Sequence, residues 1–211
     1  MENEDIRTEI TEEQPAAETE TVESAEAAPA EDEEAISARE NMKEWIKDIG
    51  IAVLIAVLLL QFIKPTIVRE HSMENTLFSN DYLFVGKMHY KLFSDYERGD
   101  IIVFKSNLSS DTGSKKLLIK RIIALPGETI SISGGVVYVD GVALEEDYTK
   151  DGFTQGEMYP VTVPEGCLFC MGDNRQNSAD SRDSRIGFVE QSTVVGKAVI
   201  RLFPFNKIGT L

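Results

Sequence analysis

TISISGGVVYVDG, residues 129–141, is the stretch of the sequence that decides the fold. Two short runs rich in Ile and Val are separated by Gly134-Gly135, and Asp140-Gly141 closes the second run. Such runs are typical of β-strands. Gly-Gly and Asp-Gly between them are strong signals of tight hairpin turns. The stretch therefore predicts consecutive antiparallel strands, within a hairpin excursion over residues 128–165 that lies between two more central strands.

The same pattern continues through the 147 residues that follow Lys64. Short apolar runs are broken by Gly, Pro, Asn and Asp, with little sign of long amphipathic helices. We expect a mostly β domain over residues 65–211, built as a small mixed β-barrel or a folded antiparallel sheet rather than as alternating β and α units. The expected strands are residues 82–88, 100–104, 117–124, 129–133, 136–139, 160–163, 168–171 and 194–203.

An apolar segment without a formal charge, IGIAVLIAVLLLQFI, occupies residues 49–63. As a helix these residues would cover about 22 Å, at about 1.5 Å per residue. A bilayer core of about 30 Å needs about 20 residues, so Trp45 and Ile46 must extend the segment. Lys47 and Lys64 would then reach the two interfaces. The sequence predicts a membrane anchor over residues 41–64.

Two other interpretations of this segment are disfavoured. A buried helix of a soluble core would show a polar face, and none is present between Ile51 and Leu60. A removable signal peptide would follow a short basic start, whereas 48 mostly polar residues come first. Three basic residues precede the segment and two follow it closely, a difference too small for the positive-inside rule to decide the orientation.

Charge is distributed unevenly along the chain. Residues 1–34 hold 14 acidic residues and one basic residue, so they carry −13 of the total net charge of −15. A segment of this composition, with no aromatic residue, cannot bury enough apolar area to offset the entropy of ordering. We expect residues 1–40 to form an acidic, disordered tail. No basic arm or stripe indicates a nucleic-acid partner.

Ser72, in the stretch Glu70-His71-Ser72-Met73, and Lys120 are candidates for nucleophilic chemistry. A serine hydroxyl needs a base, and a lysine can serve as one only when it is neutral. Strand alternation places Lys120 on the same face as Leu118 and Ile122, and burial among such side chains lowers a lysine pKa. A solvated edge strand is the alternative for a lysine that is followed by an arginine.

A polar loop, GDNRQNSADSR, occupies residues 172–182 after an apolar strand. Its carboxylates can pair with arginines, and its hydroxyls can hold an amine, as a buried lysine requires. A polar surface turn, or a cation site built from Asp173, Asn174 and Asp180, is the alternative.

Taken in order, these motifs resemble those of the bacterial type I signal peptidases, membrane-anchored serine proteases that remove signal peptides from exported proteins. The resemblance covers roughly residues 42–203. After the apolar segment it consists of HSMENTL from His71, RGDIIVF from Arg98, KRIIALPGE from Lys120 and MGDNRQNSADSR from Met171.

The resemblance implies a role for each matching residue. Ser72 would be the nucleophile, its backbone N–H would line the oxyanion hole, and Lys120 would be the general base. Ser178 would help to hold the lysine amine. The residues expected to form a salt-bridged shell around the site are Arg121, Asp173, Asp180 and Arg182.

The resemblance also implies substrates and location. The enzyme would cut exported preproteins after small residues, at shallow apolar pockets that Met73, Phe84 and Ile101 would line. The partners expected are these preproteins, the lipid bilayer and the secretion machinery. No cofactor and no metal is expected, because a dyad and an oxyanion hole suffice. The protein would cross the cell membrane once, with its N-terminus in the cytoplasm and its catalytic domain outside.

Two positions depart from the family pattern. Asn75 stands where the family usually has proline, which affects the rigidity of a turn. Glu70 stands where the family has serine or glycine, and a serine there donates a hydrogen bond to the oxyanion. An ionised carboxylate cannot donate, and losing one such donor typically slows a reaction by about 10²-fold to 10³-fold.

Other features suggest rival functions. Cys167 and Cys170 form a C-x-x-C pattern, but no helix follows it as in redox proteins, and we expect two small buried residues. His71 lies beside Ser72, yet adjacent side chains of an extended chain point apart. A Ser/Lys self-cleaving regulator would need a DNA-binding domain, and residues 1–40 offer no helix-turn-helix. A catalytically weak, membrane-tethered domain that binds exported chains without cutting them is the non-enzyme alternative.

Overall fold

The computed structural model describes residues 30–87, 95–110 and 113–211. The expected acidic tail falls mostly on residues 1–29, outside the described residues. The chain divides into two units, Met1–Gly50 and Ile51–Leu211. Each unit is described by itself.

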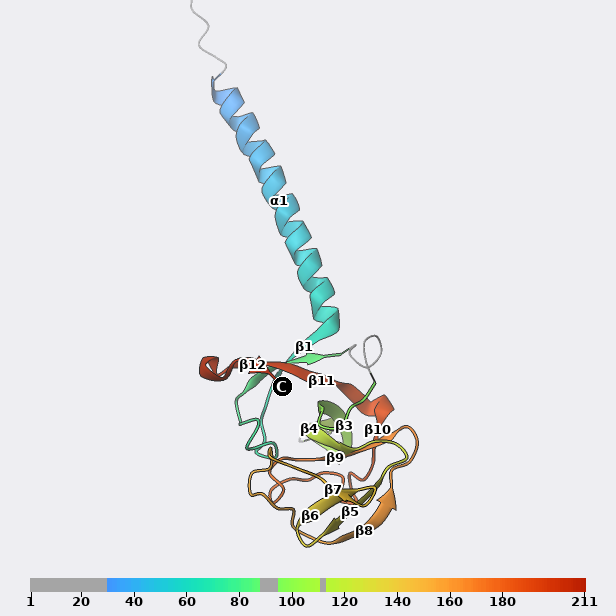
Figure 1. Cartoon of the computed structure of the whole chain (residues 1–211). Coiled ribbons are helices and arrows are strands. Elements are labelled where there is room, and N and C mark those ends of the chain that lie inside the picture. The colour runs from blue at the N-terminus through green and yellow to red at the C-terminus, as the bar shows by residue number, and fades with distance from the viewer. Residues whose placement is uncertain (1–29, 88–94, 111–112) are drawn as a thin grey trace, which may run out of the picture. The chain divides into compact units, whose positions relative to one another are not determined.

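Helix α1 extends over Ala30–Phe62, and so begins earlier than the expected anchor (Figure 1). Within it, Asn41–Phe62 is a stretch of 22 residues that is long and apolar enough to cross a membrane. Large apolar side chains along this stretch, such as Trp45 and Leu54, are exposed. A helix with such a surface is typical of a segment that faces lipid rather than water.

The second unit is built from β-strands, and every strand pair among its described residues is antiparallel. All eight expected strands are present, although Met88 lies outside the described residues. Their ends shift by at most two residues, except that the strand expected over residues 100–104 continues to Ser109. The strands are β1 (Ile63–Ile67), β2 (Tyr82–Gly86), β3 (Ile101–Ser109), β4 (Lys115–Ala124), β5 (Thr129–Ser133), β6 (Val136–Val139), β7 (Val142–Ala143), β8 (Met158–Thr162), β9 (Cys167–Met171), β10 (Val189–Glu190), β11 (Val194–Phe203) and β12 (Gly209–Thr210), and two short 3₁₀ turns, η1 (Gln191–Thr193) and η2 (Phe205–Lys207), precede and follow β11.

Sequence patterns did not reveal four of these strands. Strand β1 follows α1 directly, where we expected the anchor to continue. It contains Pro65, which a sheet tolerates here because β1 is an edge strand. Strands β7, β10 and β12 have two residues each, which is too short for any alternation to appear.

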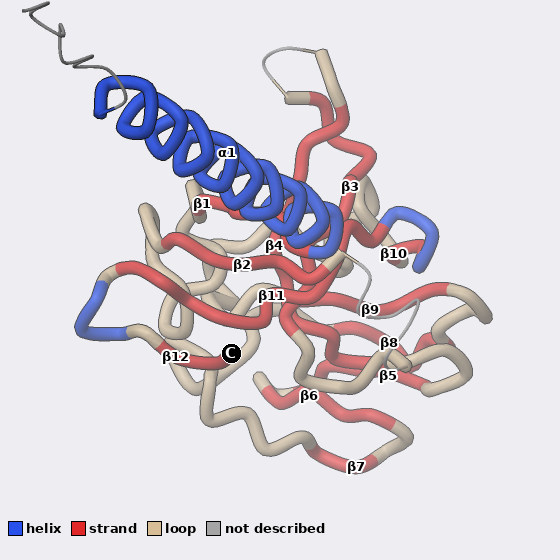
Figure 2. The backbone as a smooth tube through the Cα atoms, turned by 90° about the horizontal axis from the view of Figure 1, so that it is seen from above, coloured by secondary structure: helices blue, strands red, loops and turns tan. Residues whose placement is uncertain are grey.

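The strands form two sheets. The larger has the order β1-β2-β11-β3-β4-β9-β10, with β12 paired to β11, and the smaller has the order β7-β6-β5-β8 (Figure 2). Since β4 and β9 are neighbours, the smaller sheet is an excursion between two central strands, as predicted. The prediction of a mostly β, folded antiparallel sheet is confirmed.

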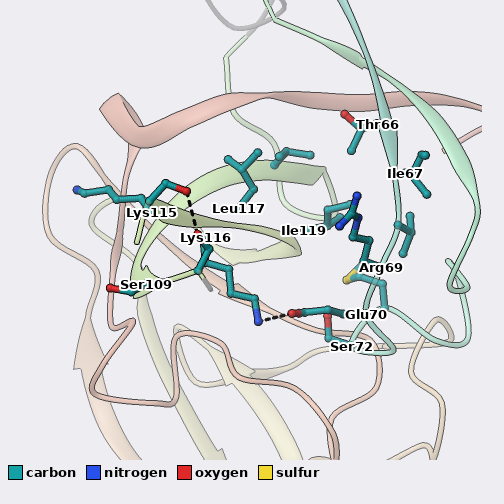
Figure 3. Close-up of a pocket in the computed structure, with 15 residues that line it drawn as sticks. Thr66, Ile67, Arg69, Glu70, Ser72, Ser109, Lys115, Lys116, Leu117 and Ile119 are labelled. Atoms are coloured by element: carbon teal, nitrogen blue, oxygen red, sulfur yellow. Dashed lines mark hydrogen bonds and ion pairs between the residues drawn. The ribbon is translucent and has the colours of Figure 1, made fainter. Parts of the chain in front are cut away.

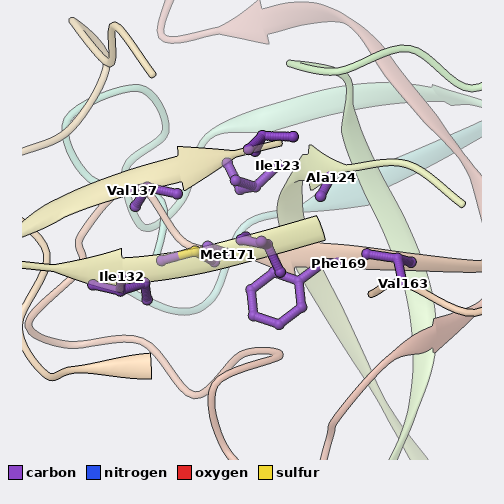
Figure 4. Packing of buried hydrophobic residues seen from close by; sticks show 9 residues of the cluster. Ile123, Ala124, Ile132, Val137, Val163, Phe169 and Met171 are labelled. Atoms are coloured by element: carbon purple, nitrogen blue, oxygen red, sulfur yellow. The ribbon is translucent and has the colours of Figure 1, made fainter. Parts of the chain in front are cut away.

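A buried apolar cluster joins the two sheets (Figure 4). Ile123 on β4 and Met171 on β9 pack with Ile132 and Val137 from the smaller sheet. Burying side chains of this kind stabilises a fold by about 1.5–3 kcal/mol each. The cluster therefore fixes the ends of β4 and β9, the strands that carry the chemistry-bearing residues.

Candidate active site

Ser72 lies in the loop between β1 and β2, and buried side chains hold that loop in place. Val68, Met73 and Leu77 belong to one apolar cluster with Leu83 of β2. The Leu77 N–H donates to the Met73 carbonyl at 2.8 Å, closing a turn directly after the serine. Ser72 itself is buried, with 6% of its surface exposed.

Lys120 reaches this serine from β4. Its Nζ lies 2.7 Å from Ser72 Oγ and 3.0 Å from the carbonyl oxygen of Ile119. The side chain is 1% exposed. Leu118 and Ile122, its neighbours on the strand face, both belong to a buried cluster, as strand alternation predicts. The solvated edge strand that we kept as an alternative is therefore wrong.

Burial changes the acidity of this lysine. Removal from water disfavours the charged amine and lowers the pKa of Lys120 from 10.5 to about 8, although the negative charges of Asp180 and Glu70 act in the opposite direction. Near pH 8 about half of the Lys120 amines are therefore neutral. A neutral amine 2.7 Å from a hydroxyl can accept its proton.

Arg121 points away from Lys120 and makes a bidentate pair with Asp173. Its Nε donates to Asp173 Oδ1 at 2.9 Å and its Nη2 to Oδ2 at 2.7 Å. The hydroxyl of Thr76 also donates to Asp173 Oδ2, at 2.5 Å. These bonds link the loop of Ser72, strand β4 and the loop after β9.

Asp180 and Arg182 form a second bidentate pair within that loop. Arg182 Nε and Nη2 lie 2.8 Å from Asp180 Oδ1 and Oδ2. Asp180 Oδ2 also accepts the Gly172 N–H at 3.0 Å. The four residues expected in a salt-bridged shell thus form two ion pairs, Arg121 with Asp173 and Arg182 with Asp180.

The main chain of Ser72 is held by Asn174, which the sequence suggested only as part of a cation site, and by the close approach of Gly172. The Asn174 N–H donates to the Ser72 carbonyl at 3.0 Å, and Asn174 Nδ2 donates to the His71 carbonyl at 3.1 Å. A side chain on Gly172 would overlap the Ser72 carbonyl and the Ser178 side chain. Only glycine permits this close approach.

Ser178 is half-buried beside this glycine, and its hydroxyl oxygen is buried but has no hydrogen-bond partner among the described residues. The expected hydrogen bond from Ser178 to the Lys120 amine is therefore not made in this structure. The hydroxyl packs towards Gly172 instead. A role for Ser178 in holding the lysine stays a prediction.

A cleft of about 650 Å³ opens at Ser72 (Figure 3). Met73 lines it, as expected, but Phe84 and Ile101 do not; Ile101 packs instead in the buried cluster of Met73. Glu70 lies in the cleft and pairs with Lys116. The side chains that line the cleft without having been singled out include Val68, Val103, Leu117 and Ile119.

A further buried pair supports the loop after β9. Arg175 is 2% exposed, and its Nη1 and Nη2 lie 2.8 Å and 2.5 Å from the two carboxylate oxygens of Glu146. Arg175 Nη1 also donates to Thr154 Oγ1 at 2.5 Å. Glu146 lies 29 positions away in a loop, where no local pattern indicates the pairing.

His71 and the two cysteines do not contact the Ser72 and Lys120 side chains by any hydrogen bond among the described residues. His71 Nδ1 lies 2.6 Å from Glu74 Oε1, and the His71 side chain is largely exposed. Cys167 and Cys170 are free thiols, and burial raises the pKa of Cys170. Over residues 30–87, 95–110 and 113–211 no group of three His, Cys, Asp or Glu side chains could hold a metal ion.

The similar proteins found by sequence and by structure are signal peptidases I. A signal peptidase I from Bacillus licheniformis is 34% identical over 188 residues, 84% of this chain and 97% of the relative. A probable signal peptidase I-1 from Synechocystis is 39% identical over 174 residues, 81% of this chain and 87% of the relative. A crystal structure of a signal peptidase I from Enterococcus faecalis matches with 34% identity and a TM-score of 0.42, covering 50% of this chain and 98% of that one.

The family model described as "Signal peptidase, peptidase S26" matches residues 42–203, most of the chain. The matched region contains Ser72, Lys120 and the whole loop of residues 172–182. The chain therefore belongs to the signal peptidases of the S26 peptidase family.

Proposed function

We propose that this protein is a membrane-bound serine endopeptidase that removes signal peptides from exported preproteins, with Ser72 as nucleophile and Lys120 as general base. The observation that carries the proposal is the 2.7 Å contact between Lys120 Nζ and Ser72 Oγ, made by a lysine that is 1% exposed. Membership of the signal peptidase family supports the substrate class.

The reaction needs no group beyond these two side chains and the main chain. Neutral Lys120 accepts the hydroxyl proton as Ser72 Oγ bonds to the carbonyl carbon of the scissile peptide. The carbon–nitrogen bond then breaks, and the Lys120 ammonium gives its proton to the leaving amine. Lys120, neutral again, takes a proton from the water that hydrolyses the ester and frees Ser72.

The oxyanion requires a donor, and Glu70 is paired with Lys116 rather than directed to this task. Among the described residues the Ser72 N–H donates no hydrogen bond, which leaves it available. We assign it as the oxyanion donor. A substrate with small side chains before the cut would lie in the cleft that Met73 lines.

The location follows from the substrate. Helix α1 would anchor the protein through Asn41–Phe62, and the preproteins emerge outside the cytoplasm. The catalytic unit would therefore lie outside and the N-terminus inside, with the bilayer and the secretion machinery as neighbours. A protease that digests the exposed part of the protein on intact cells tests this orientation.

Cleavage of a purified preprotein by the full-length protein in detergent tests the function. Ser72→Ala and Lys120→Ala should each lower the rate by at least about 10³-fold, because neither residue can act without the other. Ser133→Ala and Lys207→Ala change exposed residues of β5 and η2 that do not line the Ser72 cleft, and they serve as folded comparisons. Preprotein that is bound but left uncut by the natural protein would overturn the proposal and favour the binding-domain alternative.

A further inference from the structure

A second cleft, of about 760 Å³, lies beside the first in the unit Ile51–Leu211. Ser114, Lys115 and Leu117 line both clefts, so the two adjoin. Because side chains alternate along β4, the neighbouring lysines Lys115 and Lys116 point in different directions. Lys116 extends towards Glu70 and the Ser72 cleft, whereas the ammonium of Lys115 points away from that pair (Figure 3).

Four lysines line this second cleft, namely Lys64, Lys87, Lys105 and Lys115. No carboxylate lines it among the described residues. None of the four lysines makes an ion pair with any residue of the ranges 30–87, 95–110 and 113–211. Like charges gathered in one hollow repel one another, so an anion bound there would be strongly favoured.

Hydroxyl-bearing residues, Ser114, Ser192 and Thr193, also line the cleft. Their hydroxyls are engaged within the protein, because Ser192 and Thr193 donate to Glu190 and Ser114 is hydrogen-bonded to Ser110. The donors that the cleft offers to a ligand are therefore the lysine ammonium groups, which bind phosphate oxygens well. Val194 and Val195 add an apolar side. The lining thus fits a phosphate that carries an apolar group.

Chain connectivity places the cleft at the end of the membrane-length helix. Lys64 lies two residues beyond Phe62, the last residue of α1, and Lys87 Nζ donates to the carbonyl of Leu60 within the helix at 3.1 Å. If α1 spans the bilayer, as proposed above, these two lysines lie at the depth of the lipid headgroups.

We propose that this second cleft binds the phosphate headgroup of an anionic phospholipid. The proposal rests on the anchoring role of α1 but not on the peptidase reaction. The acidic segment of residues 1–34 is a less suitable occupant, because it precedes the span whereas the cleft follows it, and a membrane would separate them. The bound lipid would hold the catalytic unit, with its adjoining Ser72 cleft, close to the bilayer surface.

Thermal unfolding of the full-length protein in neutral detergent, with phosphatidylglycerol or phosphatidylcholine added, tests the proposal. A ligand that binds only the folded state raises the Tm with concentration. Phosphatidylglycerol should raise the Tm and phosphatidylcholine should not. Lys64→Gln with Lys105→Gln removes two of the four charges and should weaken the apparent affinity about 30-fold. Both residues lie outside the Ser72 cleft.

A matched pair of changes, Arg185→Gln with Lys207→Gln, removes the same charge outside the second cleft. This variant should keep the response to phosphatidylglycerol. Equal loss in both double variants would mean general charge attraction and would overturn the proposal. Equal stabilisation by inorganic phosphate at the same concentration would overturn the assignment to a lipid. Preprotein cleavage is measured in the same detergent without phosphatidylglycerol. If cleavage persists while phosphatidylglycerol fails to raise the Tm, the lipid proposal is overturned and the proposed function is not.

Discussion

Gly172 lies against the main-chain carbonyl of Ser72, so closely that a Cβ at position 172 would overlap the carbonyl oxygen. The Asn174 N–H, two residues further on, donates to the same oxygen at 3.0 Å. The loop after β9 therefore sets the position of the nucleophile through the backbone, independently of the Ser72 side chain.

Gly172→Ala should displace this backbone. Overpacking of this kind typically costs about 1–3 kcal/mol of stability, and a misplacement of about 1 Å in an active site lowers rates about 10²-fold. We expect kcat to fall by about 100-fold, measured on a preprotein. Gly209→Ala is the matched control, because open space surrounds Gly209. Natural activity in Gly172→Ala would mean that Ser72 does not depend on this contact.

The rate should depend on pH through the acidity of Lys120. Only the neutral amine can take the proton of Ser72, and its pKa is lowered to about 8. Under the proposed mechanism kcat/KM should therefore rise with pH from 6 and level off above about 9. A series of initial rates across this range is the measurement. A flat profile would exclude a lysine base of this acidity.

Lys120 should also make stability depend on pH. The folded chain releases the Lys120 proton at about pH 8, whereas the unfolded chain holds it to about pH 10.4. Between these values the unfolded chain binds more protons, so this group makes stability rise with pH. Below pH 8 its burial costs the folded state on the order of 3 kcal/mol.

Lys120→Met should accordingly stabilise the protein below pH 8 by a similar amount, and the gain should shrink as pH rises towards 10.5. Denaturant unfolding at pH 7, 9 and 10.5 measures it. Ile122→Met, on the same strand face, conserves volume and should change stability by less than about 1.5 kcal/mol at every pH. A gain that is equal at all pH values would point to better packing rather than to removal of a buried charge.

Local patterns predicted those features that depend on neighbours in sequence. Alternation with Leu118 and Ile122 indicated a buried Lys120, although only the family resemblance decided against a solvated edge strand, and the hairpins of the smaller sheet follow from their turn residues. Contacts across long separations could not be predicted in this way. Thr76 and Asp173 are 97 positions apart, and only the packed fold brings them together.

The expectation for Ser178 shows a second limit. Family resemblance indicated a serine near the lysine, but the partner of a hydroxyl depends on its torsion and on the path of its loop. In this structure the hydroxyl is buried against Gly172. The expectation that Phe84 and Ile101 line the cleft failed for a similar reason, because the lining depends on the strand face at which the cleft opens.

Glu70 and Lys116 should shift the pH profile in opposite directions. The negative charge of Glu70 raises the pKa of Lys120, and the positive charge of Lys116 lowers it. Glu70→Gln should move the rise of kcat/KM to lower pH, and Lys116→Gln should move it to higher pH. Both shifts should be measured at low salt, because these side chains are partly exposed and screened. Shifts in the same direction would show that the pair acts on the rate by contact with substrate and not by charge.

The Arg121–Asp173 pair should matter far more for stability than an exposed pair of the same chemistry. Asp173 is fully buried, so Asp173→Asn leaves the Arg121 charge without its partner, a change that typically costs about 3–5 kcal/mol. Asp183 pairs with Arg185 in the same bidentate manner, but the Arg185 side chain is 70% exposed. Asp183→Asn should therefore change stability little, because water screens such pairs. Denaturant unfolding of both variants makes the comparison, and equal losses would mean that burial does not set the strength of the Arg121–Asp173 pair.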